Sequence, residues 1–190
     1  MTMDLEGWND RYRAGETDGE PTPLLARMAG ALQPGKALDL ASGTGRNALW
    51  LAQNGWTVTA VDGAPAAIEI LLRKAATEKL AIDCRVANLE RGEYELKPAA
   101  WDLVAMCYYL QRDLFEPAKK AVAPNGMLLA IVHITEPGEE PTSTRMKPGE
   151  LKSYFQDWEI LHYFEGKPAD TAHRRSVAEV AAKPARSAQL

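Results

Sequence analysis

The stretch ALDLASGTGRNALWLAQNGWTVTAVD, residues 37–62, decides the fold of this chain. It opens with the short apolar run Ala37–Leu40, which is typical of a buried strand, and continues into a glycine-containing loop. Arg46–Asn54 has apolar residues at helical spacing, and Thr57–Val61 is rich in the β-branched residues that strands favour. The stretch therefore predicts a strand, a tight loop, a helix and a second strand in direct succession.

The alternation of strands and helices continues along most of the chain. Apolar spacing and breaker residues predict further helices within 3–13 and at 24–32, 65–79, 114–122 and 150–155, and further strands at 82–87, 101–107, 127–134, 158–164 and 176–183. This alternation is typical of a doubly wound α/β fold, in which helices cover both faces of a mainly parallel sheet. We therefore expect a seven-stranded sheet whose last strands include an antiparallel one.

Two segments of this pattern carry more detailed predictions. The helix at 65–79 is expected to bury one apolar stripe, formed by Ile68, Leu71, Leu72 and Ala75. The helix at 114–122 is expected to end at Pro124-Asn125-Gly126, because this tripeptide is a strong turn signal.

Length and composition favour a single domain over residues 1–190. The 190 residues are 46% hydrophobic, which is enough for a core that needs no metal or disulfide. Within the domain we distinguish an N-terminal helical segment (1–33), a βα core (37–134), and later loops and closing strands (135–183). The part Thr135–Gly149 is rich in Pro, Gly and Glu and is expected to be a long loop.

Charge and cysteine content exclude several classes of partner. The net charge is −4 and no basic stripe is present, so we do not expect nucleic acid as a partner. Cys84 and Cys107 have neither a C-x-x-C nor a metal-ligand spacing, which predicts reduced thiols, no metal site and a cytoplasmic location. No apolar run approaches the ~18–20 residues that span a bilayer, so no membrane partner is expected. The oligomeric state is left open.

The glycine loop and the acid after it point to a bound nucleoside. Gly43 and Gly45 lie where a strand turns into a helix, where larger side chains would block a flat ligand and where glycine tolerates positive φ. Ligands of such sheets bind at the carboxyl ends of the strands. Asp62 ends the next strand and can accept both ribose hydroxyl protons. The loop alone also fits a tight turn without a ligand, but the whole unit predicts an adenosine-bearing cofactor.

Two kinds of cofactor are compatible with this unit. Gly43-x-Gly45-x-x-Ala48 fits the dinucleotide fingerprint, which would indicate an NAD(P)-dependent oxidoreductase. Asp39 argues against that alternative, because a carboxylate facing a pyrophosphate is unfavourable. The same carboxylate suits a ligand that carries an ammonium and a sulfonium group.

The glycine-loop motif resembles that of a known family. Residues 37–62 resemble motif I and the following acidic strand of class I S-adenosylmethionine-dependent methyltransferases, and GRNALWLAQNGWTVTAVD resembles the tellurite-resistance methyltransferase branch. KPGELKSYFQDWEILHYFEG (147–166) and HRRSVAEVAAKP, from His173, are similar to later blocks of that branch. The chain departs from the pattern at Ala41, where many members have the first glycine, and at Ser42, where cysteine is frequent. The resemblance implies a Rossmann-like methyltransferase fold and S-adenosylmethionine as the cofactor.

The resemblance also implies roles for individual residues. It places Asp39 near the methionine amino group, Asp62 on the ribose and Asn88 at the adenine amino group, although Asn88 is equally well read as an ordinary turn residue. The residues expected to bind the cofactor are Arg11, Tyr12, Asp39, Ala41, Gly43, Gly45, Arg46, Asn47, Asp62, Gly63, Ala64, Asn88, Leu89 and Cys107. Trp8, Arg11 and Tyr12 are expected to form a lid, with surface helix packing as the alternative.

The acceptor side of the expected site contains aromatic and basic residues. Tyr108 follows the fourth strand, and either it or Tyr109 is expected to face the sulfonium, unless both only pack. The family carries a His-Arg pair similar to His173 and Arg174 and is associated with methylating oxyanions of tellurium and selenium. Tyr108, His173 and Arg174 are therefore the catalytic candidates, and a solvated basic turn is the alternative for the two basic residues. His133 is expected to form a structural hydrogen bond.

The function expected from these residues is methyl transfer from S-adenosylmethionine to a small-molecule acceptor, such as a tellurium or selenium oxyanion or another soft nucleophile. Two alternatives remain at this point. One is an NAD(P)-dependent oxidoreductase, and the other is a non-catalytic module that binds S-adenosylmethionine.

Overall fold

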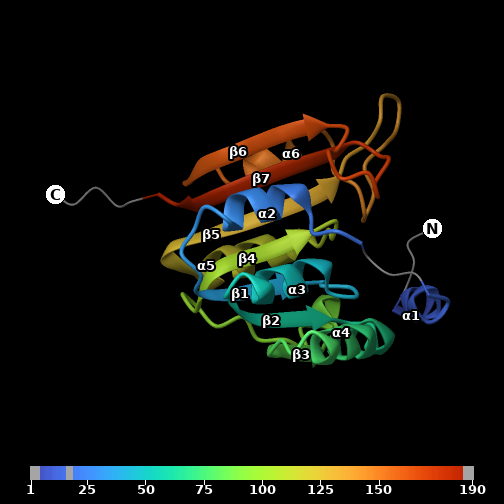
Figure 1. The fold of residues 1–190 in the computed structure, drawn as a ribbon. Helices are drawn as coiled ribbons and strands as arrows, with labels where there is room; N and C mark the ends of the chain where they lie inside the picture. The colour runs from blue at the N-terminus through green and yellow to red at the C-terminus, as the bar shows by residue number, and fades with distance from the viewer. Residues whose placement is uncertain (1–4, 16–18, 186–190) are drawn as a thin grey trace. The chain divides into compact units, whose positions relative to one another are not determined.

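The computed structural model describes residues 5–15 and 19–185 (Figure 1). The elements in chain order are α1 (Leu5–Arg13), α2 (Pro23–Ala29), β1 (Lys36–Leu40), α3 (Arg46–Gln53), β2 (Thr57–Asp62), α4 (Pro65–Thr77), β3 (Ile82–Val86), the 3₁₀ turn η1 (Leu89–Arg91), β4 (Trp101–Cys107), the 3₁₀ turn η2 (Arg112–Leu114), α5 (Phe115–Ala121), β5 (Val122–His133), α6 (Glu150–Ser153), β6 (Trp158–Gly166) and β7 (Val177–Pro184).

The strands form one seven-stranded sheet in the order β3-β2-β1-β4-β5-β7-β6. Strand β2 pairs in parallel with both β1 and β3, whereas β7 pairs antiparallel with both β5 and β6. The predicted fold class is therefore confirmed, including the antiparallel strand near the end of the chain. By internal contacts the chain divides into two units, Met1–Glu95 with Ala105–Cys107 and Leu96–Val104 with Tyr108–Leu190.

In the first unit, the glycine loop connects β1 to α3 as predicted. Gly45 precedes α3 with φ 87°, a conformation that favours glycine. A Cβ atom on Gly45 would lie 2.2 Å from Cδ1 of Leu71, which belongs to α4. The close packing of α4 therefore requires glycine here, in addition to any requirement from a ligand.

Helix α4 buries a different stripe from the one predicted. Ile68, Leu71 and Ala75 are buried as expected, but Leu72 is 49% exposed, so that part of the prediction is wrong. Ala66 and Ala67 are buried in addition. Leu72 lies at the margin of the stripe, and the helix is turned so that its small alanines, not this leucine, approach the sheet.

In the second unit, β5 is longer than predicted. Helix α5 ends at Ala121, one residue before the predicted end, but Pro124-Asn125-Gly126 lies inside β5, so the predicted start of this strand at Met127 is wrong. A Cβ atom on Gly126 would lie 2.8 Å and 2.9 Å from the carbonyl oxygens of Trp101 and Asp102 in β4. Glycine at this position therefore permits a close backbone approach within the sheet, which is a common reason for glycine in a strand.

The loop at 135–149 is firmly attached to the second unit. Arg112 donates from Nε to Glu150 Oε1 (2.7 Å) and from its terminal nitrogens to the carbonyls of Thr142 (3.0 Å) and Arg145 (3.3 Å). Met146 donates its backbone N–H to the carbonyl of His133 at 3.0 Å. Among the residues 5–15 and 19–185, no helix is long and apolar enough to cross a membrane.

Candidate functional site

The glycine loop is tied to the end of β2 by the backbone and by one carboxylate. Ser42 donates its N–H to the carbonyl of Val61 at 3.1 Å. Oδ2 of Asp62 accepts the N–H of Gly43 and Oδ1 accepts the N–H of Ala64, both at 2.8 Å. These two hydrogen bonds hold the Asp62 carboxylate in one orientation beside the glycine loop.

A second buried carboxylate lies on the neighbouring strand. Asp39 is 1% exposed and is paired in register with Ala60 of β2, while Asp62 is 8% exposed at the end of that strand. The hydroxyl of Ser42 in the loop is also buried and has no hydrogen-bond partner among the described residues. Two buried carboxylates with a buried hydroxyl fit a cofactor that carries positive charge and hydroxyl donors. They would oppose a diphosphate.

Three residues of the loop have left-handed backbone conformations. Ala41 and Gly43 both have φ 55°, and Gly45 has φ 87°. Only Ala41 has a side chain, and a left-handed conformation costs a residue with a Cβ atom about 1–2 kcal/mol. Ala41 is thus strained at the position where the motif that it resembles has its first glycine.

Arg46 and Asn47 have partners in the segment before α2. Asn47, 5% exposed, accepts the backbone N–H of Thr22 at its Oδ1 atom at 2.9 Å. Arg46 donates to the carbonyl of Glu20 at 3.4 Å. These side chains hold the entry to α2, and their direct contact with a cofactor stays a prediction.

Asn88 acts as the cap of a turn. Its Oδ1 atom accepts the N–H groups of Glu90 (2.9 Å) and Arg91 (3.3 Å), and its own N–H donates to Glu93 at 2.9 Å. The oxygen that was expected to meet the adenine amino group therefore already has two donors. The turn role is the one that the structure shows, and the adenine role stays a prediction. Leu89, the next residue, is buried.

The N-terminal helix α1 lies against α4 (Figure 1). The guanidinium of Arg11 lies 4.7 Å from the ring centre of Trp8, and the Trp8 and Tyr12 rings are stacked at 5.8 Å. Two further α1 residues, Leu5 and Asn9, contact the segment that follows Asp62. Sequence patterns gave no sign of these two contacts, because they join residues 57 or more positions apart.

An aromatic cluster lies in the second unit, starting at the residue after β4. Tyr108 has φ 60°, which is strained for a bulky residue, and its ring stacks on His173 with centres 3.4 Å apart and planes at 5°. His133 lies 5.6 Å from the Tyr108 ring and 5.3 Å from the His173 ring. Tyr109 instead donates to Gln111 at 2.8 Å. The cluster thus joins the predicted residues Tyr108 and His173, while Cys107 lies half-buried at the end of β4.

The neutral form of His133 is favoured by its surroundings. Burial lowers the pKa of its imidazole, and the nearby cations Arg175 and Arg145 lower it further, against the opposite effect of the Ser176 backbone. Nδ1 of His133 is buried and has no hydrogen-bond partner among the described residues. The structural hydrogen bond expected of this residue therefore does not involve Nδ1.

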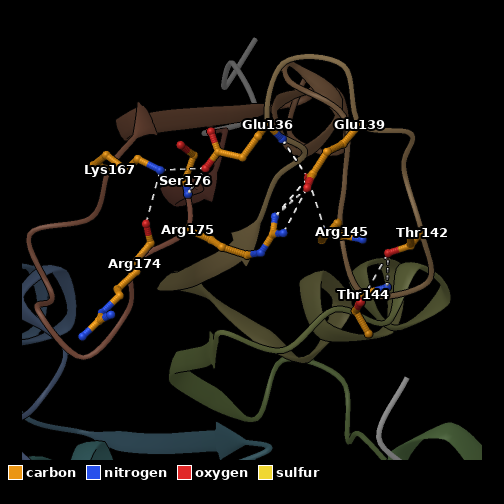
Figure 2. A network of polar contacts seen from close by, with 9 residues as sticks. All are labelled: Glu136, Glu139, Thr142, Thr144, Arg145, Lys167, Arg174, Arg175 and Ser176. Atoms are coloured by element: carbon orange, nitrogen blue, oxygen red, sulfur yellow. Dashed lines mark hydrogen bonds and ion pairs between the residues drawn. The ribbon is translucent and has the colours of Figure 1, made fainter. Parts of the chain in front are cut away.

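The basic run at 173–175 is divided between two roles (Figure 2). Arg175 binds Glu139 with two contacts at 2.9 Å and 3.0 Å, and Glu139 also pairs with Arg145 at 3.3 Å. These cations lower the pKa of Glu139 to about 2. The side chain of Arg174 points away from this network, and its guanidinium has no ion pair within 5–15 and 19–185. Among the residues that the structure describes, Glu139 therefore neutralises Arg175 but not Arg174.

Lys167 completes the same network. It donates to Glu136 Oε1 at 2.7 Å and to the carbonyl of Arg174 at 3.2 Å, and Glu136 also accepts the N–H of Ser176 at 3.0 Å. The pKa of Glu136 falls to about 2, chiefly because of the Lys167 hydrogen bond. The backbone that carries Arg174 is thus fixed from both sides.

Comparison with known proteins identifies the family. A model of the family described as "Tellurite resistance protein TehB" matches residues 6–175. The chain belongs to this family. The resemblance found in the sequence is confirmed.

The chain is also similar to individual proteins and to a solved structure. The chain is 33% identical to Hemagglutinin 1 of Eikenella corrodens, over 70% of this chain and 46% of that protein. It is 27% identical to "Probable S-adenosyl-L-methionine-dependent methyltransferase TehB" of Haemophilus influenzae, over 70% of this chain and 49% of that protein. The chain thus spans about half the length of these curated relatives. The solved structure of TehB from Haemophilus influenzae has the same fold, with a TM-score of 0.73, 24% identity, and coverage of 95% of this chain and 67% of that one.

Proposed function

We propose that this chain transfers a methyl group from S-adenosylmethionine to a small-molecule acceptor. The observation that carries the proposal is the Asp62 carboxylate, held by the N–H groups of Gly43 and Ala64 beside the glycine loop. Membership of the TehB family supports it, as do the names of the Haemophilus influenzae relatives.

The first unit supplies the residues that would bind the cofactor. Asp62 is oriented to accept the two ribose hydroxyls, and the buried charge of Asp39 attracts the amino group of the methionine part. When bound, S-adenosylmethionine supplies a methyl group on a positively charged sulfur. Gly43 leaves the backbone open beside the ligand, since it has no side chain.

The second unit supplies the residues that would receive the acceptor. Arg174 attracts an anion, so an oxyanion of tellurium or selenium, or another soft anionic nucleophile, is the acceptor class that we favour. Such an acceptor needs little acid–base help, and orientation alone can contribute roughly 7–11 kcal/mol to the rate. His173, packed on the rigidly held Tyr108, takes the proton from an acceptor that carries one.

Binding of the demethylated cofactor, S-adenosylhomocysteine, tests the first part of this proposal. Isothermal titration calorimetry should show binding to the native chain and at least roughly tenfold weaker binding to Asp62→Asn, since a hydrogen bond to a charged group is worth about 1.5–3 kcal/mol. Asp83→Asn is the matched control, because Asp83 is a half-exposed acid on β3 that pairs with Arg85, two residues away.

The outcomes separate the three candidate functions. Absence of S-adenosylhomocysteine binding at millimolar concentration would reject the proposal, and binding of NADH in its place would favour an oxidoreductase. Binding without any transfer of labelled methyl to selenite or tellurite, or to a thiol, in single-turnover assays would favour a non-catalytic module.

A further inference from the structure

Helix α1 is attached to the segment that directly follows the proposed ribose-binding acid. A Cβ atom on Gly63 would lie 2.7 Å from Cδ2 of Leu5, so the leucine side chain packs against the glycine backbone. Asn9 accepts the N–H of Ala66 at its Oδ1 atom at 3.0 Å. Both contacts therefore fall within the four residues after Asp62.

The Asn9 contact replaces a missing helix cap. Ala64 occupies the N-cap position of α4 and has no side chain that could accept a hydrogen bond, and Pro65 has no N–H. Ala66 is thus the first residue of α4 whose N–H needs a partner. Asn9 supplies that partner from another helix, which makes the start of α4 dependent on the docking of α1.

The Leu5 contact lies where two cofactor-side segments meet. The same Cβ position on Gly63 would lie 3.6 Å from Cα of Asn88, so the residues after β2 and after β3 are adjacent there. Leu5 is 37% exposed, so part of its apolar side chain is still accessible. An adenine ring beside Gly63 would bury some of that accessible part.

Helix α1 itself buries little apolar surface. None of its residues is buried, and Trp8, which is also 37% exposed, stacks on Tyr12 of the same helix. An element with so little buried apolar surface opens at low cost in free energy. Its attachment is therefore sensitive to anything that strengthens or orders the segment after Asp62.

We propose that Leu5 and Asn9 are positioning residues for the cofactor, Leu5 as an apolar wall beside the adenine and Asn9 as the cap that orders the start of α4. This inference rests on the function proposed above. Since coupling between two sites is reciprocal, a bound nucleoside stabilises the docked α1 by the same factor by which docked α1 strengthens nucleoside binding. The expected lid role of Trp8, Arg11 and Tyr12 stays a prediction beside this one.

Calorimetry with S-adenosylhomocysteine tests the proposal on the full chain. Leu5→Ala and Asn9→Ala should each weaken binding about 5- to 20-fold, within the usual range for coupled sites. Asn9→Asp keeps an oxygen acceptor for Ala66 and should bind within about twofold of the native chain. Leu72→Ala makes the same truncation at an exposed site of the first unit and should leave binding unchanged.

Limited trypsin digestion provides a second readout that does not depend on activity. S-adenosylhomocysteine should slow cleavage after Arg11 and Arg13 of α1 in the native chain, and should protect these bonds much less in Leu5→Ala. Circular dichroism of each variant establishes that the chain remains folded.

Several results would overturn the inference. Native affinity in both Leu5→Ala and Asn9→Ala would refute it while leaving the proposed function intact. An equal loss in Leu72→Ala would show that general destabilisation, not α1 docking, is responsible. Failure of the native chain to bind S-adenosylhomocysteine at all would instead reject the proposed function, and the inference with it.

Discussion

Replacing Ala41 by glycine should stabilise the folded chain. Ala41 has φ 55°, and relief of the left-handed conformation is worth about 1–2 kcal/mol. Glycine loses more backbone entropy on folding, which reduces this gain in stability by about 0.5–1 kcal/mol. The expected net gain is therefore about 0.5–1 kcal/mol, or roughly 1–4 °C in the melting temperature of a chain of this size.

The same substitution on a regular helix should have the opposite sign. Ala76 is exposed in α4, where a glycine costs about 0.8–1 kcal/mol, so Ala76→Gly should lower the melting temperature. Differential scanning calorimetry of both variants measures the contrast directly. A loss of stability in Ala41→Gly equal to that in Ala76→Gly would refute the assignment of backbone strain to this loop.

Three further predictions concern charge and packing. Arg174→Ala should reduce turnover of an anionic acceptor with little change in S-adenosylhomocysteine affinity. Arg175→Ala should mainly lower thermal stability, because the Arg175 guanidinium is held by Glu139. Equal losses of turnover in both variants would contradict this difference. The pKa of Glu139 is lowered from 4.5 to about 2, so the stability that this group contributes is complete above about pH 4.5 and is lost as the pH falls toward 2. In urea unfolding, the free energy of unfolding of Glu139→Gln should therefore change less with pH over this range than that of the native chain. Gly45→Ala should lower the free energy of unfolding by about 2–5 kcal/mol, because the new Cβ overpacks against Leu71 and because φ is 87°. A double-mutant cycle with Leu71→Ala should show a measurable coupling energy, and strictly additive effects of the two substitutions would exclude the clash.

The cofactor-binding unit was predictable because its signals are local. The strand before the glycine loop, the helix after it and the strand that ends at Asp62 each follow from apolar spacing or glycine chemistry within a few residues. Predictions were wrong where the conformation depends on residues far away in the sequence. Pro124-Asn125-Gly126 is a turn signal by composition, but the approach of the β4 backbone makes Gly126 part of a strand.

The contacts of individual side chains were less predictable than the elements that carry them. Asn88 could be placed after the third strand, but whether its oxygen would meet a ligand or cap a turn depended on the conformation of the next three residues. Arg174 and Arg175 are neighbours of identical chemistry. Only the position of Glu139, on a loop far away in the sequence, distinguishes the neutralised arginine from its neighbour.

By itself, the sequence determined that this chain is a doubly wound α/β protein with a glycine loop and an acid at the end of the second strand, because periodicity and backbone preference act over short distances. The tertiary structure alone decided that Leu5 and Asn9 contact the segment from Gly63 to Ala66, that Tyr108 and His173 stack, and that Glu139 pairs with Arg175. These contacts are between residues that are distant in the chain. Their energies depend on which side chains the folded backbone brings within a few ångströms of each other.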